Sequence, residues 1–140
     1  MKIIWLEDEP ETIEVIQDEI TQYCSEIIIC QSFLTFSEDI ASLEDNGENI
    51  IIIDIKMIFN REIHFQCFNK TIKINNELDS GFEYFNHCLH GRFKNVKIIF
   101  FSSKPQKEAM EDAKRHNINS DIIISKEYTM ELLEIIRGEQ

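Results

Sequence analysis

The chain has few basic residues for its number of acidic ones. It contains 14 Lys and Arg against 26 Asp and Glu, so its formal net charge is −12 at pH 7. Nucleic-acid binding depends on clustered Lys and Arg that contact phosphates. An anionic membrane surface attracts the same cationic residues. The charge balance therefore argues against both nucleic acid and membrane as partners.

Long apolar runs and paired cysteine motifs are also missing. The longest apolar runs, at 50–53 and 96–101, are far too short to cross a bilayer. The first residues lead directly into a strand pattern, so we expect no signal peptide. The four cysteines are Cys24, Cys30, Cys67 and Cys88. Because none of them forms a Cys-x-x-Cys pair, we expect reduced thiols in a cytoplasmic protein.

The length and the histidine spacing limit the possible architectures. We expect residues 1–140 to form a single domain, which is long enough to bury a core without disulfides or metal ions. The histidines are His64, His87, His90 and His116. No further ligands stand at zinc-binding spacing beside them, so we predict no zinc site.

Short apolar segments alternate with helical patterns along the chain. The expected strands lie at 2–6, 26–33, 50–53, 96–101 and 121–125. The expected helices lie at 10–24, near 36–43, from 78–85, at 105–117 and near 130–136. In the first and last of these, Tyr23 and Met130 are expected on the buried face, and Gly138 ends the last helix. The alternation predicts a parallel sheet with helices on both faces.

Polar side chains follow four of the five predicted strands. Glu7 and Asp8 follow the first strand, Asp54 the third, Ser102 the fourth and Lys126 the fifth. Because the carboxyl ends of parallel strands open on one edge, we expect these residues to converge there. Three converging carboxylates repel one another, and a hard divalent cation such as Mg²⁺ relieves that repulsion.

The chemistry of this set is that of phosphoryl transfer to a carboxylate. An ionised Asp54 beside Mg²⁺ is a competent nucleophile towards phosphorus. The Ser102 hydroxyl and the Lys126 amine could then bind the oxygens of the transferred group, where negative charge spreads in the transition state.

The order of the segments LEDEP, IIIIDIKM, IIFFSS and IIISKE resembles the receiver domain of two-component response regulators. The resemblance implies an α/β fold of the flavodoxin-like type, with a doubly wound five-stranded parallel sheet in the order 2-1-3-4-5. It also implies a stand-alone signalling receiver that is not an enzyme. Its phosphoryl donor would be a histidine kinase or a phosphotransfer protein, its output partner is unknown, and a homodimer is possible.

The resemblance assigns a role to each polar residue expected at this edge of the sheet. Glu7 and Asp8 would organise the Mg²⁺ ion, Asp54 would be both metal ligand and phosphoacceptor, and the Lys56 backbone carbonyl would be a further metal ligand. Ser102 would be the hydroxyl switch residue and Lys126 the phosphate-binding lysine.

Three features depart from the receiver pattern. Glu127 replaces the proline that commonly follows the lysine, and Ile123 replaces an aromatic residue that usually reports phosphorylation. An insertion at 58–78 separates the third strand from the third helix. Its two alternating segments, with Asn69 and Lys70 between them, predict a β-hairpin. The hairpin could bind a partner, cover the acceptor, mediate self-association, or be a tolerated surface loop.

Other functions remain open from the sequence. The first alternative is a receiver-like protein-binding module that uses the inserted hairpin and does not depend on phosphorylation. A phosphohydrolase with an aspartyl nucleophile usually carries a second aspartate two residues on, where this chain has Lys56. A flavin-binding flavodoxin must accept a phosphate in its first loop, where the acidic run at 7–9 would repel it.

Overall fold

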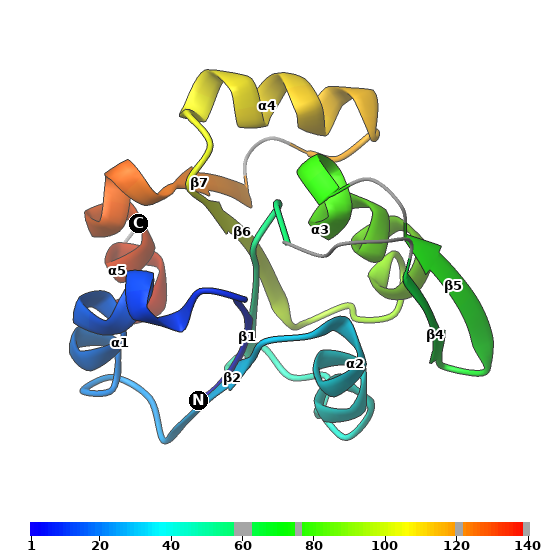
Figure 1. The fold of residues 1–140 in the computed structure, drawn as a ribbon. Helices are drawn as coiled ribbons and strands as arrows, with labels where there is room; N and C mark the ends of the chain where they lie inside the picture. Colours follow the sequence, from blue (N-terminus) through cyan, green and yellow to red (C-terminus); the bar gives the residue numbers. More distant parts are fainter. Residues whose placement is uncertain (58–62, 75–76, 120–121, 139–140) are drawn as a thin grey trace.

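A five-stranded parallel sheet forms the centre of the molecule (Figure 1). The computed structural model describes residues 1–57, 63–74, 77–119 and 122–138. The sheet strands are β1 (Lys2–Leu6), β2 (Glu26–Cys30), β3 (Ile50–Ile53), β6 (Lys97–Ser102) and β7 (Ile123–Ser125). They lie in the order β2-β1-β3-β6-β7, which confirms the flavodoxin-like order predicted from the sequence.

Helices cover both faces of this sheet. The α-helices are α1 (Glu14–Ile20), α2 (Phe33–Ala41), α3 (Ser80–Tyr84), α4 (Gln106–Arg115) and α5 (Thr129–Arg137). The short helical turns are η1 (Pro10–Ile13), η2 (Glu77–Asp79), the π-helical turn η3 (Phe85–Leu89) and η5 (Lys126–Tyr128). Helices α1 and α5 lie on one face, and α2, α3 and α4 lie on the other (Figure 1). Within the described ranges, every helix is too short or too polar to traverse a lipid bilayer.

Two residues expected in the core are exposed instead. Tyr23 is 42% exposed, because α1 ends at Ile20 and the chain has already left the helix at position 23. Met130 is 58% exposed, while Leu132 is fully buried. The prediction used residues spaced by three, and such residues do not stay on one face of a helix with 3.6 residues per turn. The buried face of α5 therefore contains Leu132 and Leu133 but not Met130. Gly138 ends α5 in the left-handed conformation, at φ 80°.

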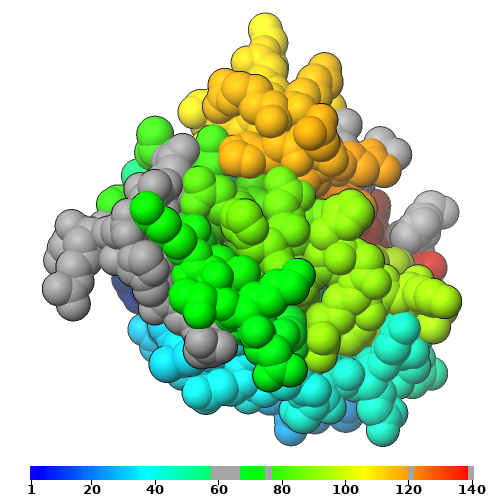
Figure 2. All heavy atoms as spheres, turned by 90° about the vertical axis from the view of Figure 1, so that its right-hand side faces the viewer, coloured from blue at the N-terminus to red at the C-terminus, as the bar shows by residue number. Residues whose placement is uncertain are grey.

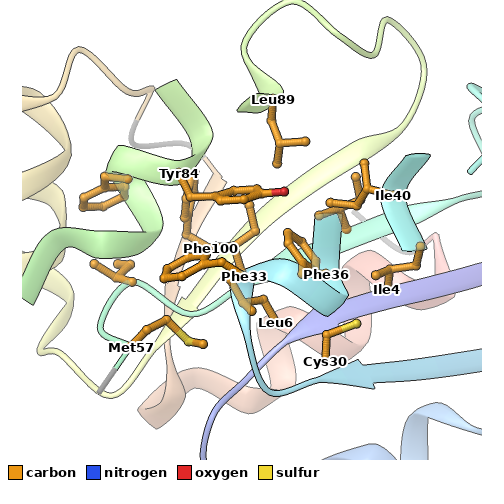
Figure 3. Close-up of a cluster of buried hydrophobic side chains, with 14 of the residues drawn as sticks. Ile4, Leu6, Cys30, Phe33, Phe36, Ile40, Met57, Tyr84, Leu89 and Phe100 are labelled. Carbon is orange, nitrogen blue, oxygen red and sulfur yellow. The ribbon is translucent and has the colours of Figure 1, made fainter. Parts of the chain in front are cut away.

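The core consists of two apolar clusters, one on each face of the sheet. β3 is buried on both faces, so its four isoleucines contribute to both clusters. In the cluster under α2 and α3, the Tyr84 ring stacks on Phe33 and packs against Phe36 (Figure 3). The Tyr84 hydroxyl makes a 2.7 Å hydrogen bond with the Ser37 hydroxyl, which satisfies a polar group inside the core.

The insertion contains a β-hairpin formed by β4 (Ile63–Cys67) and β5 (Lys70–Ile74). The turn predicted at Asn69 and Lys70 is wrong. The turn residues are Phe68 and Asn69, with φ values of 51° and 69°, and Lys70 pairs with Cys67 as the first residue of β5. Positive φ at both central residues is the geometry of a tight two-residue hairpin.

The hairpin packs into the body of the protein. β4 lies beside α2, and β5 lies beside α3 (Figure 1). With the turn at 68–69, Cys67, Ile72 and Ile74 share one strand face, and all three are buried in the α2–α3 cluster. Of the predicted insertion at 58–78, residues 58–62 and 75–76 lie outside the described residues.

Candidate functional site

Backbone hydrogen bonds continue the parallel ladders just beyond the ends of β2, β1 and β3. The Asp54 N–H donates to the Leu6 carbonyl at 3.0 Å, and the Glu7 N–H donates to the Cys30 carbonyl at 2.9 Å. These bonds hold Glu7 and Asp54 at adjacent strand ends, on the edge predicted from the sequence.

Three carboxylates meet at this edge. Glu7, Asp8 and Asp54 each present a carboxylate oxygen within 4.8 Å of the other two. Glu7 and Asp54 are buried, and Asp8 is partly exposed. Burial, reinforced by the negative charge of Glu7, raises the pKa of Asp54 to about 9. Without a cation, Asp54 therefore holds a proton at neutral pH.

Lys126 supplies the positive charge of the site. It begins η5 directly after β7, and its amine lies 2.7 Å from Glu7 Oε1. The same amine donates to the Thr12 hydroxyl at 3.3 Å. Its charge also favours the ionised form of Asp54, but burial and Glu7 outweigh this and keep the pKa of Asp54 raised.

A hollow of about 130 Å³ opens among these groups. Its lining residues are Glu7, Asp8, Glu9, Thr12, Asp54, Lys56, Ser103 and Lys126. The structure thus brings together five of the six predicted site residues. No lining residue within the described ranges comes from β4 or β5, so the described hairpin strands do not cover Asp54.

Ser102 is the predicted residue that does not line the hollow. It is fully buried at the end of β6, and its hydroxyl oxygen accepts a hydrogen bond from the Lys104 N–H at 3.2 Å. Ser103, the next residue, lines the hollow in its place.

The donor set fits a magnesium ion. Every side-chain donor of the acidic group is a carboxylate oxygen, the ligand type that Mg²⁺ prefers. Octahedral Mg²⁺ holds its ligands at about 2.1 Å, so oxygens on opposite sides of the ion lie about 4 Å apart. The observed spread of up to 4.8 Å is close to that span. A cation there would also offset the burial and the Glu7 charge that keep a proton on Asp54.

Helix α3 begins against the loop that follows Asp54. The Gly81 N–H donates to the Ile55 carbonyl at 2.8 Å, and a Cβ atom on Gly81 would lie only 2.1 Å from the Asp54 carbonyl oxygen. Only glycine allows this approach. The Met57 N–H donates to the Ser80 hydroxyl at 3.0 Å, so the chain leaves for the insertion and returns from it at the same point.

A buried ion-pair network that sequence reasoning missed lies beside the site. The Lys104 amine lies 2.9 Å from Asp79 at the start of α3 and 2.5 Å from Asp112 on α4. All three side chains are at most 9% exposed. Arg115 pairs with Asp112, and His116 lies 3.1 Å from Asp79. One lysine therefore ties α3 to α4.

The network shifts the pKa values of Asp79 and Lys104 towards their charged forms. Burial alone would raise the pKa of Asp79, but hydrogen bonds from Lys104 and His116 hold that pKa below its usual value. Burial alone would lower the pKa of Lys104, but both aspartates raise it. One signal in the sequence was available: Asp112 shares a helix face with the buried Ala109 and Ala113.

Comparisons with known proteins support the fold. No protein-family model and no curated protein matches the sequence. The structure resembles the N-terminal domain of an uncharacterized protein from Wolinella succinogenes, with 18% identity, a TM-score of 0.59, and 99% of this chain and 94% of that chain covered. It also resembles a response regulator from Colwellia psychrerythraea, with 14% identity, a TM-score of 0.54, and 99% and 98% covered. The chain has the receiver fold of response regulators, as its motifs predicted.

Proposed function

We propose that this chain is a Mg²⁺-dependent receiver that accepts a phosphoryl group on Asp54 and signals through changed partner binding. The donor would be a histidine kinase or a phosphotransfer protein. The observation that carries the proposal is that one hollow in a receiver fold is lined by Glu7, Asp8, Asp54 and Lys126, from three different strand ends.

The transfer is a direct displacement at phosphorus. A carboxylate oxygen of Asp54 attacks the phosphorus atom, and the bond from phosphorus to the donor nitrogen breaks. The electron pair stays with the donor imidazole, and the product is an aspartyl phosphate. Bound Mg²⁺, held by Glu7, Asp8, Asp54 and the Lys56 carbonyl, would neutralise the charge of the carboxylates and the phosphoryl oxygens.

Lys126 has two available partners in this scheme. In the structure its amine contacts Glu7. A phosphoryl group on Asp54 would place new anionic oxygens in the same hollow, and an amine forms strong charge-assisted hydrogen bonds with such oxygens. In this scheme Lys126 would bind the phosphoryl group from its present position beside Glu7.

Ser102 offers a route for the signal to leave the site. To reach a phosphoryl group on Asp54, its hydroxyl would give up the hydrogen bond from the Lys104 N–H. The Lys104 side chain ties Asp79 on the α3 side to Asp112 on α4. We propose that this network replaces the aromatic readout that other receivers use at the position of Ile123, which is buried here.

The test is chemical labelling read by intact mass. The protein is incubated with Mg²⁺ and acetyl phosphate, and we expect a gain of one phosphoryl group that hydroxylamine removes. Asp54→Asn should gain nothing. Asp18→Asn, which changes an exposed aspartate on α1, is the matched control and should label like the wild type. Persistent labelling of the Asp54→Asn protein would refute the assignment.

The second candidate is a receiver-like binding module that works without phosphate. Ile123 favours it, because an aliphatic side chain cannot serve as the aromatic switch. The same labelling experiment separates the two functions, since this module would gain no hydroxylamine-sensitive adduct even as wild-type protein.

A further inference from the structure

A second hollow, of about 370 Å³, lies between the turn of the inserted hairpin and the end of η3. Phe68 and Lys70 contribute from the hairpin, and His87, His90 and Arg92 contribute from η3 and the residues after it. On this face of the molecule the green hairpin residues lie directly beside the lime-coloured segment that follows α3 (Figure 2). The volume lies within the range of small-molecule sites.

The charge of this hollow is opposite to that of the protein. Four of its lining residues are lysine, arginine or histidine, whereas the whole chain carries a net charge of −12. Among the described residues that line it, none is an aspartate or a glutamate. Elsewhere in the described chain, Lys104 lies between two aspartates and Lys126 pairs with Glu7. Grouped cations without a lining carboxylate attract an anion.

Arg92 is held in place by the hairpin turn. The central carbon of its guanidinium lies 3.3 Å from the centre of the Phe68 ring. A stacked guanidinium keeps its planar set of N–H donors at the edge, where they can bind an anion. Phe68 itself has a φ of 51°, which is an uncommon conformation for a bulky residue. The strained turn thus places the ring under Arg92.

We propose that this hollow binds the phosphate group of a small molecule. The Arg92 fork matches two phosphate oxygens, and Lys70 adds a compact positive charge. His87 on η3 and His90 directly after it both line the hollow, so both imidazoles lie near the same anion. The hairpin supplies Phe68 and Lys70, and η3 and the residues after it supply His87, His90 and Arg92. The proposed phosphate site therefore needs both segments.

The test is a titration with inorganic pyrophosphate, followed by two-dimensional amide NMR in buffer containing EDTA. Without Mg²⁺, and with Asp54→Asn as the background, the acidic site takes no part. We expect saturable shifts of the amide signals of residues 67–70 and 87–92. The double variant Lys70→Gln/Arg92→Gln should bind at least tenfold more weakly.

The matched control is Lys107→Gln/Lys114→Gln, which removes two exposed lysines from α4 and changes the net charge equally. Its affinity should stay within twofold of the parent protein. Equal losses in the two double variants would overturn the proposal, as would shifts centred on another surface. The proposal also fails if a phosphoserine peptide saturates the hollow while pyrophosphate does not. None of these outcomes depends on whether Asp54 accepts phosphate.

Discussion

At the scale of single residues, the burial of Asp54 decides its protonation. Desolvation and the nearby Glu7 raise its pKa to about 9, and a protonated carboxyl group is a poor nucleophile. A divalent cation beside it would favour the carboxylate. In the proposed function, this burial would therefore make the reaction of Asp54 with phosphorus dependent on the metal.

This dependence predicts how Mg²⁺ binding changes with pH. In the metal-free protein Asp54 keeps its proton up to about pH 9, so Mg²⁺ must displace that proton. We expect the affinity for Mg²⁺ to rise from pH 6 towards pH 9, with release of about one proton per ion at pH 7. Calorimetry in two buffers of different ionisation enthalpy measures the released proton. A pH-independent affinity would contradict the raised pKa.

At the scale of elements, the site depends on the close approach of α3 to the loop after β3. Gly81 and Ser80 join the helix start to Ile55 and Met57. Lys104 then joins the same helix start to α4. Each junction can be tested by one substitution and a matched control.

The first junction predicts a large cost for Gly81→Ala. The added Cβ would meet backbone atoms of Asp54 and Ile55, which cannot move aside as a flexible side chain could. We expect a loss of about 3 kcal/mol in the free energy of unfolding, measured with urea. The control is Gly47→Ala, where the nearest atom to a new Cβ lies 4.0 Å away. A loss in Gly81→Ala no larger than in the control would contradict the packing described here.

The second junction predicts that Lys104→Met destabilises the protein by about 3 kcal/mol, because Asp79 and Asp112 remain buried without their shared cation. Lys107→Met, on the exposed side of α4, should change the free energy of unfolding by about 0.5 kcal/mol or less. Chemical denaturation at pH 7 measures both variants. Equal stabilities would show that the network contributes nothing.

The stability difference between the wild type and Lys104→Met depends on pH, because the pKa of Asp79 is lowered in the folded protein. A depressed carboxyl pKa contributes stability that is fully present above the unfolded value near 3.8. That contribution is lost as the pH falls through the lower pKa of the folded state. The difference between the wild type and Lys104→Met should therefore shrink in strong acid.

At the scale of the whole molecule, sequence reasoning predicted the sheet order and the edge where the acidic residues meet. The sheet order was implied by the resemblance to receiver domains. The shared edge follows from local signals, since buried runs such as 50–53 mark strands and parallel topology brings their carboxyl ends together. The Lys104 network could not be predicted in the same way. Its members are ordinary surface residues by type, and only the packing of α3 against α4 buries them.

The register of the hairpin also could not be predicted from the sequence. Alternation predicted two strands, but the register depends on which face reaches the core. Ile72 and Ile74 on β5, which lies against α3, decide that by joining the buried cluster. The basic hollow follows from this register, because the turn at 68–69 brings Phe68 under Arg92. The turn predicted at Asn69 and Lys70 would not have led to this hollow.

The central claim, that Asp54 accepts the phosphoryl group, is tested most directly by trapping the product and locating it. The protein is incubated with Mg²⁺ and acetyl phosphate and then treated with borohydride, which reduces an aspartyl phosphate to homoserine. Peptide mass mapping identifies the converted residue. We predict homoserine at position 54 only when donor and Mg²⁺ are both present. Conversion of a different acidic residue, or no conversion at all, would contradict the account.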